Sequence, residues 1–283
     1  MNIPNNFGGL APRYSGYDSS GIVILPVPFD NTSTWLHGAD TGPTKIIEAS
    51  QNMELFDIET GSEIYRNGIF TDEPINAETS AEMVEEVQAR VGKHLAAEKF
   101  VVTLGGEHTV SLGAIQAHLA KFDNLSILQL DAHTDLRDSY EGNRLSHACV
   151  MARVRESTDE VVAVGVRSMD ESEGELLDEE RTIFAHEMQT SGWIKRVVRE
   201  LNENVYITLD LDVFDPAFMP STGTPEPGGM DWWAVMRLLQ AVSEDKRVVG
   251  FDVVELCPNE HNRAPDFLAA KLIYRLLSLR FGR

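Results

Sequence analysis

Short apolar runs alternate along this chain with longer stretches in which apolar residues recur at helical spacing. The apolar runs are rich in β-branched residues and lie at residues 21–27, 67–70, 100–104, 126–130, 160–166, 182–185, 205–209 and 248–254. Continuous apolar runs of this length are typical of strands that are buried on both faces of a sheet. We therefore predict about eight strands.

Amphipathic stretches separate most of these runs and predict helices. They lie at residues 44–56, 80–98, 111–122, 192–202, 230–245 and 265–279. This alternation indicates an α/β fold, in which a mostly parallel sheet is covered by helices on both faces. Because no run rich in Pro, Gly or Ser divides the sequence, we expect a single domain over residues 1–283.

The composition limits the cellular setting that we expect. The chain has 283 residues, of which 42% are hydrophobic, so it can bury a large core. No apolar stretch approaches membrane-spanning length, and the first residues lack the charged start and apolar middle of a signal peptide. Two cysteines that form no CxxC pair are compatible with a reducing compartment. We expect a cytoplasmic protein with no membrane partner.

The net charge of −21 argues against nucleic acid as a partner, because proteins that bind phosphate backbones normally present clustered Lys and Arg. An acidic surface can concentrate a cationic substrate. Most of these carboxylates, however, lie in stretches that read as ordinary solvated helix faces, so the charge supports a cationic substrate only weakly.

Candidate metal ligands follow or end three of the predicted strands. They are His108 in GGEH, Asp131, His133 and Asp135 in DAHTD, and Asp210 and Asp212 in LDLD. In open parallel α/β sheets, active sites gather at the carboxyl edge of the sheet, where these residues would lie. A spacing of two residues in an extended chain puts both side chains on one face. The sequence therefore predicts a metal site at this edge.

The donor set favours two metal ions over one. Four aspartates carry a charge of about −4, which two divalent ions neutralise and one does not. Carboxylate and imidazole donors without thiolate disfavour structural zinc and suit Mn, with Fe, Co, Ni or Zn as alternatives. A lone Asp at a strand end is usually a cap, and a lone His is usually structural. Six such residues at matching strand ends outweigh that reading, and DAHTD carries most of the weight.

Five motifs resemble those of the ureohydrolase family, the arginase and agmatinase group. They are GGEH (105–108), DAHTD (131–135), LDLDVFDP (209–216), STGTPEPGG (221–229) and FDVVEL (251–256), and they occur in the family's order. PVPFD and HGADTGP near the N-terminus extend the resemblance over nearly the whole chain. The resemblance implies a three-layer α/β/α sandwich with a binuclear manganese site, two Mn²⁺ ions per subunit, and a homo-oligomer, a trimer or hexamer.

The resemblance also implies roles for individual residues. One manganese would be bound by His108, Asp131, Asp135 and Asp210, and the other by Asp131, His133, Asp210 and Asp212. Glu255 matches the family glutamate that holds the substrate guanidinium, and Thr224 matches a hydroxyl that lines the same pocket. His147 resembles the family histidine that shuttles protons, although a histidine that caps the following helix is an alternative.

The implied reaction is hydrolysis of a guanidinium by a hydroxide that bridges two metals, with Asp135 passing a proton to the departing amine. The chain has Arg137, followed by DSYEG, where arginases typically have an Asn that helps to read the α-carboxylate and α-amine. We therefore expect agmatine as the small-molecule guanidino substrate, giving putrescine and urea. Arg137 keeps guanidinobutyrate open as a substrate, unless it forms a surface salt bridge with Asp138 or Glu141.

Other functions also fit parts of the sequence. Arginine and formimidoylglutamate are further candidate substrates, and formimidoylglutamate would give formamide in place of urea. A binding protein on the same fold would be expected to have lost ligands, whereas all six candidates are present. A deacetylase with one zinc would not explain six ligands together with Glu255. Trp35 and His37 lie in an N-terminal loop that could approach the site, and we assign them no role.

Overall fold

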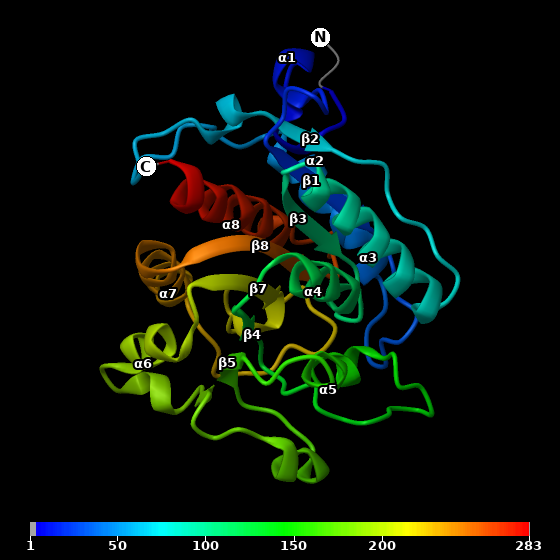
Figure 1. The fold of residues 1–283 in the computed structure, drawn as a ribbon, viewed down its shortest axis with the longest axis vertical. Coiled ribbons are helices and arrows are strands. Elements are labelled where there is room, and N and C mark those ends of the chain that lie inside the picture. The colour runs from blue at the N-terminus through cyan, green and yellow to red at the C-terminus, as the bar shows by residue number, and fades with distance from the viewer. Residues whose placement is uncertain (1–3, 283) are drawn as a thin grey trace.

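The computed structural model describes residues 4–282, and its centre is one sheet of eight strands (Figure 1). The strands are β1 (Ile22–Val27), β2 (Ile69–Thr71), β3 (Phe100–Gly105), β4 (Leu125–Leu130), β5 (Val161–Val166), β6 (Thr182–Phe184), β7 (Asn204–Asp210) and β8 (Arg247–Val254). Their order is β2-β1-β3-β8-β7-β4-β5-β6, and every neighbouring pair is parallel. Each predicted strand is present.

Helices cover both faces of this sheet (Figure 1). One layer consists of α3 (Ser80–Ala96), α4 (Val110–Lys121) and α5 (Val150–Arg155), in which α4 contacts both neighbours. The opposite layer consists of α2 (Gly42–Ser50), α8 (Ala264–Phe281), α7 (Trp232–Asp245) and α6 (Trp193–Glu200). The predicted three-layer α/β/α sandwich is confirmed. A short helix, α1 (Pro12–Ser15), precedes β1.

Two apolar cores lie between the layers, one on each face of the sheet. Along β7, Val205, Ile207 and Leu209 pack into the core beneath α7 and α8, whereas Tyr206 packs into the core beneath α3 and α4. Because successive strand side chains point to opposite faces, a strand with both faces covered is apolar at most positions, and its few buried polar side chains need hydrogen-bond partners. This is the physical reason for the unbroken apolar runs in the sequence.

The helices differ from the prediction most clearly at the end of α2 and in α5. The stretch 44–56 gives a helix that ends at Ser50, since the backbone N–H of Met53 turns back to the Ser50 carbonyl. The six-residue helix α5 was not predicted, because it is too short to show helical periodicity. Among residues 4–282, no helix is long and apolar enough to cross a bilayer.

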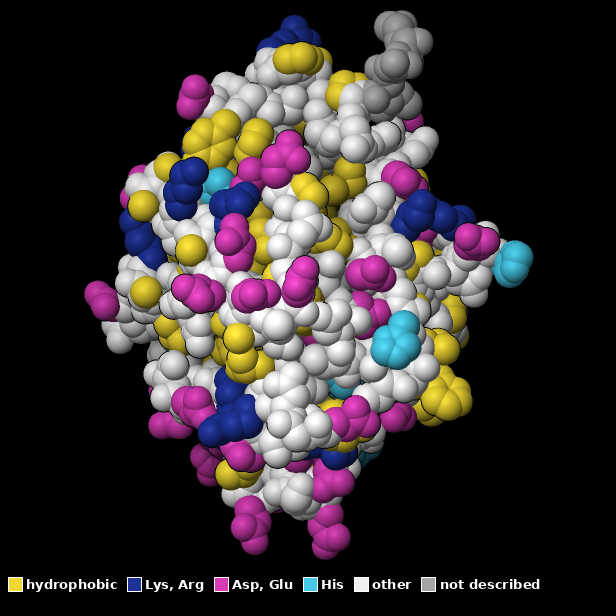
Figure 2. All heavy atoms as spheres, turned by 90° about the vertical axis from the view of Figure 1, so that its right-hand side faces the viewer, with side chains coloured by type: hydrophobic (Ala, Val, Ile, Leu, Met, Phe, Trp, Pro, Cys, Tyr) yellow, Lys and Arg dark blue, Asp and Glu magenta, His cyan; other side chains and the backbone are white. Residues whose placement is uncertain are grey.

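Acidic side chains are scattered over the face of the molecule seen in Figure 2, with Lys and Arg among them. They form no single acidic patch on that face. This distribution agrees with the interpretation of most carboxylates as ordinary solvated positions.

Candidate active site

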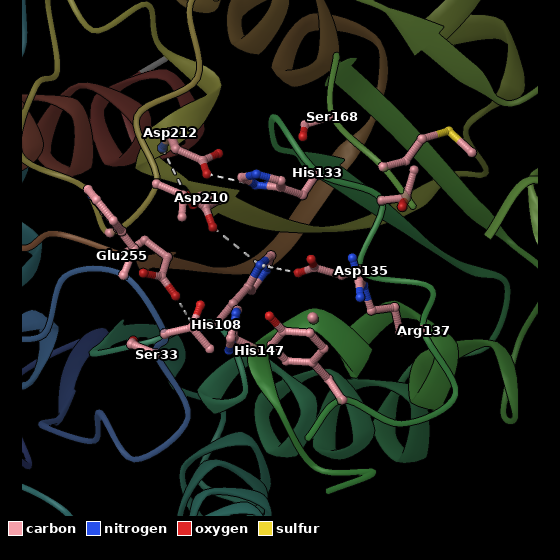
Figure 3. Close-up of a pocket in the computed structure, with 18 of the residues that line it drawn as sticks. Ser33, His108, His133, Asp135, Arg137, His147, Ser168, Asp210, Asp212 and Glu255 are labelled. Atoms are coloured by element: carbon pink, nitrogen blue, oxygen red, sulfur yellow. Dashed lines mark hydrogen bonds and ion pairs between the residues drawn. The ribbon is translucent and has the colours of Figure 1, made fainter. Parts of the chain in front are cut away.

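The predicted site residues that follow strands meet at the carboxyl ends of four adjacent strands, and Figure 3 shows His108, Asp210 and Glu255 among them. His108 follows β3, Glu255 follows β8, Asp210 ends β7 and Asp131 follows β4. The sheet order β3-β8-β7-β4 makes these strands neighbours, although their sequence order is different. Parallel pairing thus brings segments that are far apart in the sequence to one edge of the sheet.

The first cluster surrounds His108. Its Nδ1 lies 3.2 Å from Asp131 Oδ2, 2.9 Å from Asp135 Oδ2 and 3.3 Å from Asp210 Oδ2. All four side chains are almost completely buried. His108, Asp131 and Asp135 place their ligand atoms closely enough to hold one metal ion.

The second cluster shares Asp131 with the first. His133 Nδ1 lies 2.9 Å from Asp212 Oδ2 and 3.6 Å from Asp131 Oδ1, and these three residues form a second group that could hold a metal ion. Two adjacent triads with one common carboxylate are consistent with a binuclear centre. Carboxylate and imidazole donors suit divalent transition metals.

The spacing of two residues acts through turns and not, as we predicted, through an extended chain. Asp131 Oδ1 accepts the backbone N–H of His133 at 2.6 Å, and Asp210 Oδ1 accepts that of Asp212 at 2.8 Å. Asp212 lies in the 3₁₀ helix Leu211–Val213, so the prediction of two side chains on one face of a strand is wrong. An aspartate that bonds its own backbone two residues on stabilises such a turn. Both motifs use the first Asp to orient the second ligand.

A buried hydrogen-bond chain behind His108 leaves its Nδ1 suited to a cation. Thr208 Oγ1 donates to Asp252 Oδ1 at 2.9 Å, so its oxygen accepts the Nε2–H of His108 at 3.0 Å. In the neutral ring Nδ1 then carries a lone pair, and this buried atom has no hydrogen-bond partner although it faces three carboxylates. Burial disfavours a charged ring, but the nearby Asp131, Asp135 and Asp210 outweigh it and raise the pKa of His108 well above its usual value, so this position favours a positive charge, either a proton or a metal ion. A lone pair that faces carboxylates is repelled unless a cation lies between them. These residues therefore fit a metal ion.

Burial and mutual repulsion also disfavour a cluster of carboxylates that lacks a cation. Burial, and then the charges of Asp212 and Asp131, raise the pKa of Asp210 well above its usual range. Burial, and then the charge of Asp131, raise the pKa of Asp135 to about 6. Positive charge from a metal ion would favour the ionised form of both groups.

Glu255 borders the metal cluster from the end of β8. Its Oε1 accepts the backbone N–H of His108 at 2.8 Å, and its backbone has a φ of 66°, a value that non-glycine residues rarely adopt. Burial, and then the charge of Glu107, raise its pKa well above the usual range. A cationic ligand at this carboxylate would offset the cost of burying its charge.

A cavity of about 260 Å³ opens onto the metal cluster. The cavity is lined by His108, His133, Asp135, Glu255, His147 and Thr224. Thr224 is the exposed member of this set. His147 begins a short 3₁₀ helix, His147–Cys149, and burial, and then the charges of His108 and His133, lower its pKa to about 4. At neutral pH it is therefore an uncharged base.

Comparison with known proteins agrees with this geometry. A profile described as the arginase family matches residues 20–278. The chain belongs to the arginase family. It is an enzyme of the ureohydrolase type, so the reading as a binding protein is not supported.

Several relatives resemble this arginase-family chain over nearly its full length. An N(1)-aminopropylagmatine ureohydrolase of Thermus thermophilus is 38% identical over 93% of this chain and 92% of its own. An agmatinase of Bacillus cereus is 34% identical over 93% of each chain. The solved agmatine ureohydrolase of Thermoplasma volcanium superposes with a TM-score of 0.88 at 30% identity, over 99% of this chain and 95% of its own.

Arg137 lines the cavity of this arginase-family enzyme, but its partners differ from those we predicted. Its guanidinium lies 3.5 Å from Asp170 Oδ2 and 4.8 Å from the centroid of the Tyr140 ring. Asp138 instead pairs with Arg144 and Arg153. The predicted pair with Asp138 or Glu141 is therefore wrong.

The N-terminal loop does reach the site. Trp35 lines the cavity, although it is 73% exposed. His37 is not part of the lining, and its Nδ1 lies 3.9 Å from Asp30 Oδ1. No sequence motif predicted a role for Thr32 or Glu107. Thr32 contacts both His147 and Glu107. Glu107 lies in the GGEH motif, and its place in that motif was the one sequence feature that could have indicated a role.

Proposed function

We propose that this chain hydrolyses the guanidinium group of agmatine-type amines and releases urea. The proposal rests on two metal-binding triads that share Asp131. Residues of both triads line the same cavity as Glu255. A cationic guanidinium that enters this cavity would meet a buried carboxylate on one side and the metal cluster on the other.

We propose Mn²⁺, two ions per subunit, as the cofactor. One ion would be held by His108, Asp131, Asp135 and Asp210, and the other by Asp131, His133, Asp210 and Asp212. Bound metal ions supply Lewis-acid activation of water near neutral pH. The hard carboxylate donors and the two imidazoles support manganese over a soft metal.

Three side chains would handle the substrate and its protons. Glu255 would bind the guanidinium through charge-assisted hydrogen bonds and fix its orientation, with Thr224 lining the same pocket. Asp135 would pass a proton to the departing amine. His147 would exchange protons with solvent, a role that an uncharged imidazole can perform.

Agmatine is the first candidate substrate. It carries no carboxylate, and the pairing of Arg137 with Asp170 at 3.5 Å offsets the cation that would otherwise repel the amine at the far end of agmatine. The similarity to agmatinases supports the same choice. Hydrolysis of agmatine gives putrescine and urea, which would place the enzyme in polyamine biosynthesis.

N1-aminopropylagmatine is a second candidate, because a further cavity adjoins the first. This cavity of about 500 Å³ shares Ser168 and Met169 with the active-site cavity and extends toward Phe184 and His186. It offers room for a longer substrate tail. Relatives with that activity are 32% and 38% identical to this chain.

The test is urea release by purified, manganese-loaded enzyme from agmatine, N1-aminopropylagmatine, guanidinobutyrate and arginine in parallel, with a metal-stripped control. We expect urea from one or both of the amines only, and a loss of more than about 100-fold in the Asp210→Asn and His133→Asn variants. Full activity in either variant would contradict the two-metal scheme. Formamide in place of urea would point to a formimidoyl substrate.

We also propose that residues 1–283 act as a single ureohydrolase domain and assemble as a homo-oligomer, a trimer or hexamer. The continuous eight-stranded sheet supports one domain. A light-scattering mass near 31.5 kDa, the mass of one chain, would contradict the oligomer.

A further inference from the structure

The hydroxyl of Thr32 joins three groups beside the active-site cavity. Thr32 Oγ1 donates to Glu107 Oε1 at 2.9 Å, accepts the backbone N–H of His147 at 3.0 Å, and lies 3.1 Å from His147 Nδ1. Thr32 directly precedes the loop residues Ser33 to Leu36, which line the cavity. The three contacts connect the N-terminal loop, the GGEH motif and the histidine of the cavity wall.

These contacts determine which ring nitrogen of His147 carries the proton. The Thr32 hydroxyl has one hydrogen, and it donates this hydrogen to the carboxylate of Glu107. The Thr32 oxygen must therefore be the acceptor in its two contacts with His147. His147 Nδ1 therefore carries its hydrogen, which the hydroxyl oxygen of Ser146, 3.3 Å from Nδ1, can also accept, and in the neutral ring Nε2 carries the lone pair. Within residues 4–282, no side chain or backbone group hydrogen-bonds Nε2. That nitrogen is left available to exchange a proton.

Further contacts hold Glu107, His147 and the loop that carries Thr32. Glu107 is completely buried, and its second carboxylate oxygen accepts the backbone N–H of Thr109 at 2.7 Å. The ring of Tyr140 meets the His147 ring edge to face, with centroids 5.7 Å apart and planes at 87°. The loop that carries Thr32 is closed by Asp30, whose Oδ2 accepts the backbone N–H groups of Gly38 and Ala39.

We propose that Thr32, anchored by Glu107, is a positioning residue that fixes the tautomer and orientation of His147 for proton exchange during hydrolysis. This inference rests on the proposed function, in which His147 is the proton carrier. Thr32 itself touches neither metal nor substrate in this scheme. Thr32 would affect the reaction only through the imidazole of His147. An experiment can therefore distinguish this role from direct contact with metal or substrate.

The matched variants are Thr32→Val, which keeps the shape and removes the hydroxyl, and Thr32→Ser, which keeps the hydroxyl. In manganese-loaded enzyme we expect Thr32→Val to lower kcat by about 10- to 100-fold with little change in KM, because acid–base catalysis is weakened while substrate binding is not. Thr32→Ser should stay near wild type. Metal content, measured by mass spectrometry, should be equal in all three proteins. Equal losses in Val and Ser variants would overturn the proposal.

A double-mutant cycle with His147→Ala separates positioning from a general structural effect. If Thr32 acts through His147, Thr32→Val should cause almost no further loss in the His147→Ala background. Losses that multiply would show that Thr32 acts independently of the imidazole and would overturn the proposal.

A measurement that does not depend on catalysis tests the role of Thr32 separately from the proposed function. In metal-free protein labelled with ¹⁵N-histidine, the signals absent from His147→Ala identify His147. We expect the Nδ1–H form in wild type and Thr32→Ser, and a mixture of tautomers in Thr32→Val. An Nε2–H form in wild type would overturn the positioning role. If wild type shows the expected tautomer but releases no urea from any guanidine, the proposed function has failed while the positioning contact stands.

Discussion

At the scale of single residues, the metal cluster depends on groups behind the ligands as much as on the ligands. Gln129 donates to Asp131 Oδ2 at 2.9 Å, and Thr208 holds His108 at 3.0 Å while bonded to Asp252. Such contacts fix the direction of a ligand's lone pair, and without them a metal site loses affinity.

Replacing Thr208 by Val tests this support directly. Valine keeps the buried shape but cannot accept the Nε2–H of His108, so the tautomer that leaves the Nδ1 lone pair free is no longer favoured. We expect metal affinity to fall by about 10- to 100-fold, as measured by competition with a chelator of known affinity. Thr208→Ser is the control and should bind metal as wild type does. An unchanged affinity in the Val variant would show that the hydroxyl has no part in metal binding.

Arg137 and Asp170 should set the preference between amine and carboxylate substrates. Removing the cation in Arg137→Ala should raise kcat/KM for agmatine relative to guanidinobutyrate by about 3- to 10-fold, because a positive charge no longer faces the amine. Asp170→Ala leaves Arg137 unpaired and should shift the ratio in the opposite direction. Parallel urea assays measure both ratios. If both variants shifted the ratio the same way, the pair would not control selectivity.

The sequence predicted the residues that gather in the two metal-binding triads but not the residues that orient them, for a physical reason. Asp131, His133 and Asp135 stand together in one motif, and strand ends in a parallel sheet must meet at one edge. Thr32 and Glu107 are 75 positions apart, and Thr32 and His147 are 115 apart. Nothing in local periodicity encodes such a contact, since it depends on how a loop folds back over the finished sheet.

At the scale of elements, strands were predictable because burial on both faces leaves an apolar run, whereas helix ends were not. Helix α3 begins where Thr79 and Glu82 form a reciprocal cap, a pattern that is visible in the sequence. Helix α2 ends at Ser50 although apolar residues continue, because Met53 reaches the core from a turn. At Met53, apolar character therefore predicted burial correctly but predicted a helix incorrectly.

The turn after β3, which carries His108, depends on the absence of a side chain at Gly106. A Cβ at this position would lie 2.0 Å from the backbone oxygen of Phe29, a backbone atom just beyond β1 that also accepts the N–H of Glu107. We expect Gly106→Ala to lower the free energy of unfolding by roughly 3 kcal/mol and to reduce metal binding. Chemical denaturation measures the first effect and chelator competition the second.

Gly92 provides the matched control for Gly106→Ala. It lies inside α3, and a Cβ there would meet nothing within 4 Å. Because Ala favours a helix over Gly, Gly92→Ala should raise stability by about 1 kcal/mol. Equal effects at the two glycines would mean that close approach to Phe29 does not constrain the turn.

At the scale of the whole molecule, acid stability should reflect a histidine far from the catalytic chemistry. His118 in α4 is completely buried, with its ring 4.5 Å from that of Tyr206 and its Nδ1 bonded to the Ala114 carbonyl. Burial lowers its pKa from 6.5 to about 4. As pH falls below 6.5, the unfolded chain takes up a proton at this site and the folded chain does not, so stability is lost until pH 4.

The His118→Asn variant should separate this effect from the protonation of every other group. Asn can still donate to Ala114 but does not titrate, so it should lower stability at all pH values while flattening the pH dependence. Between pH 7 and pH 5, wild type should lose about 2 kcal/mol more than the variant, as measured by urea denaturation at both pH values. Parallel losses in the two proteins would mean that His118 accepts a proton in the folded state as readily as in the unfolded chain. Acid sensitivity would then arise at other groups, among them His147, whose pKa is lowered in the same way, and the carboxylate cluster, where protons compete with metal.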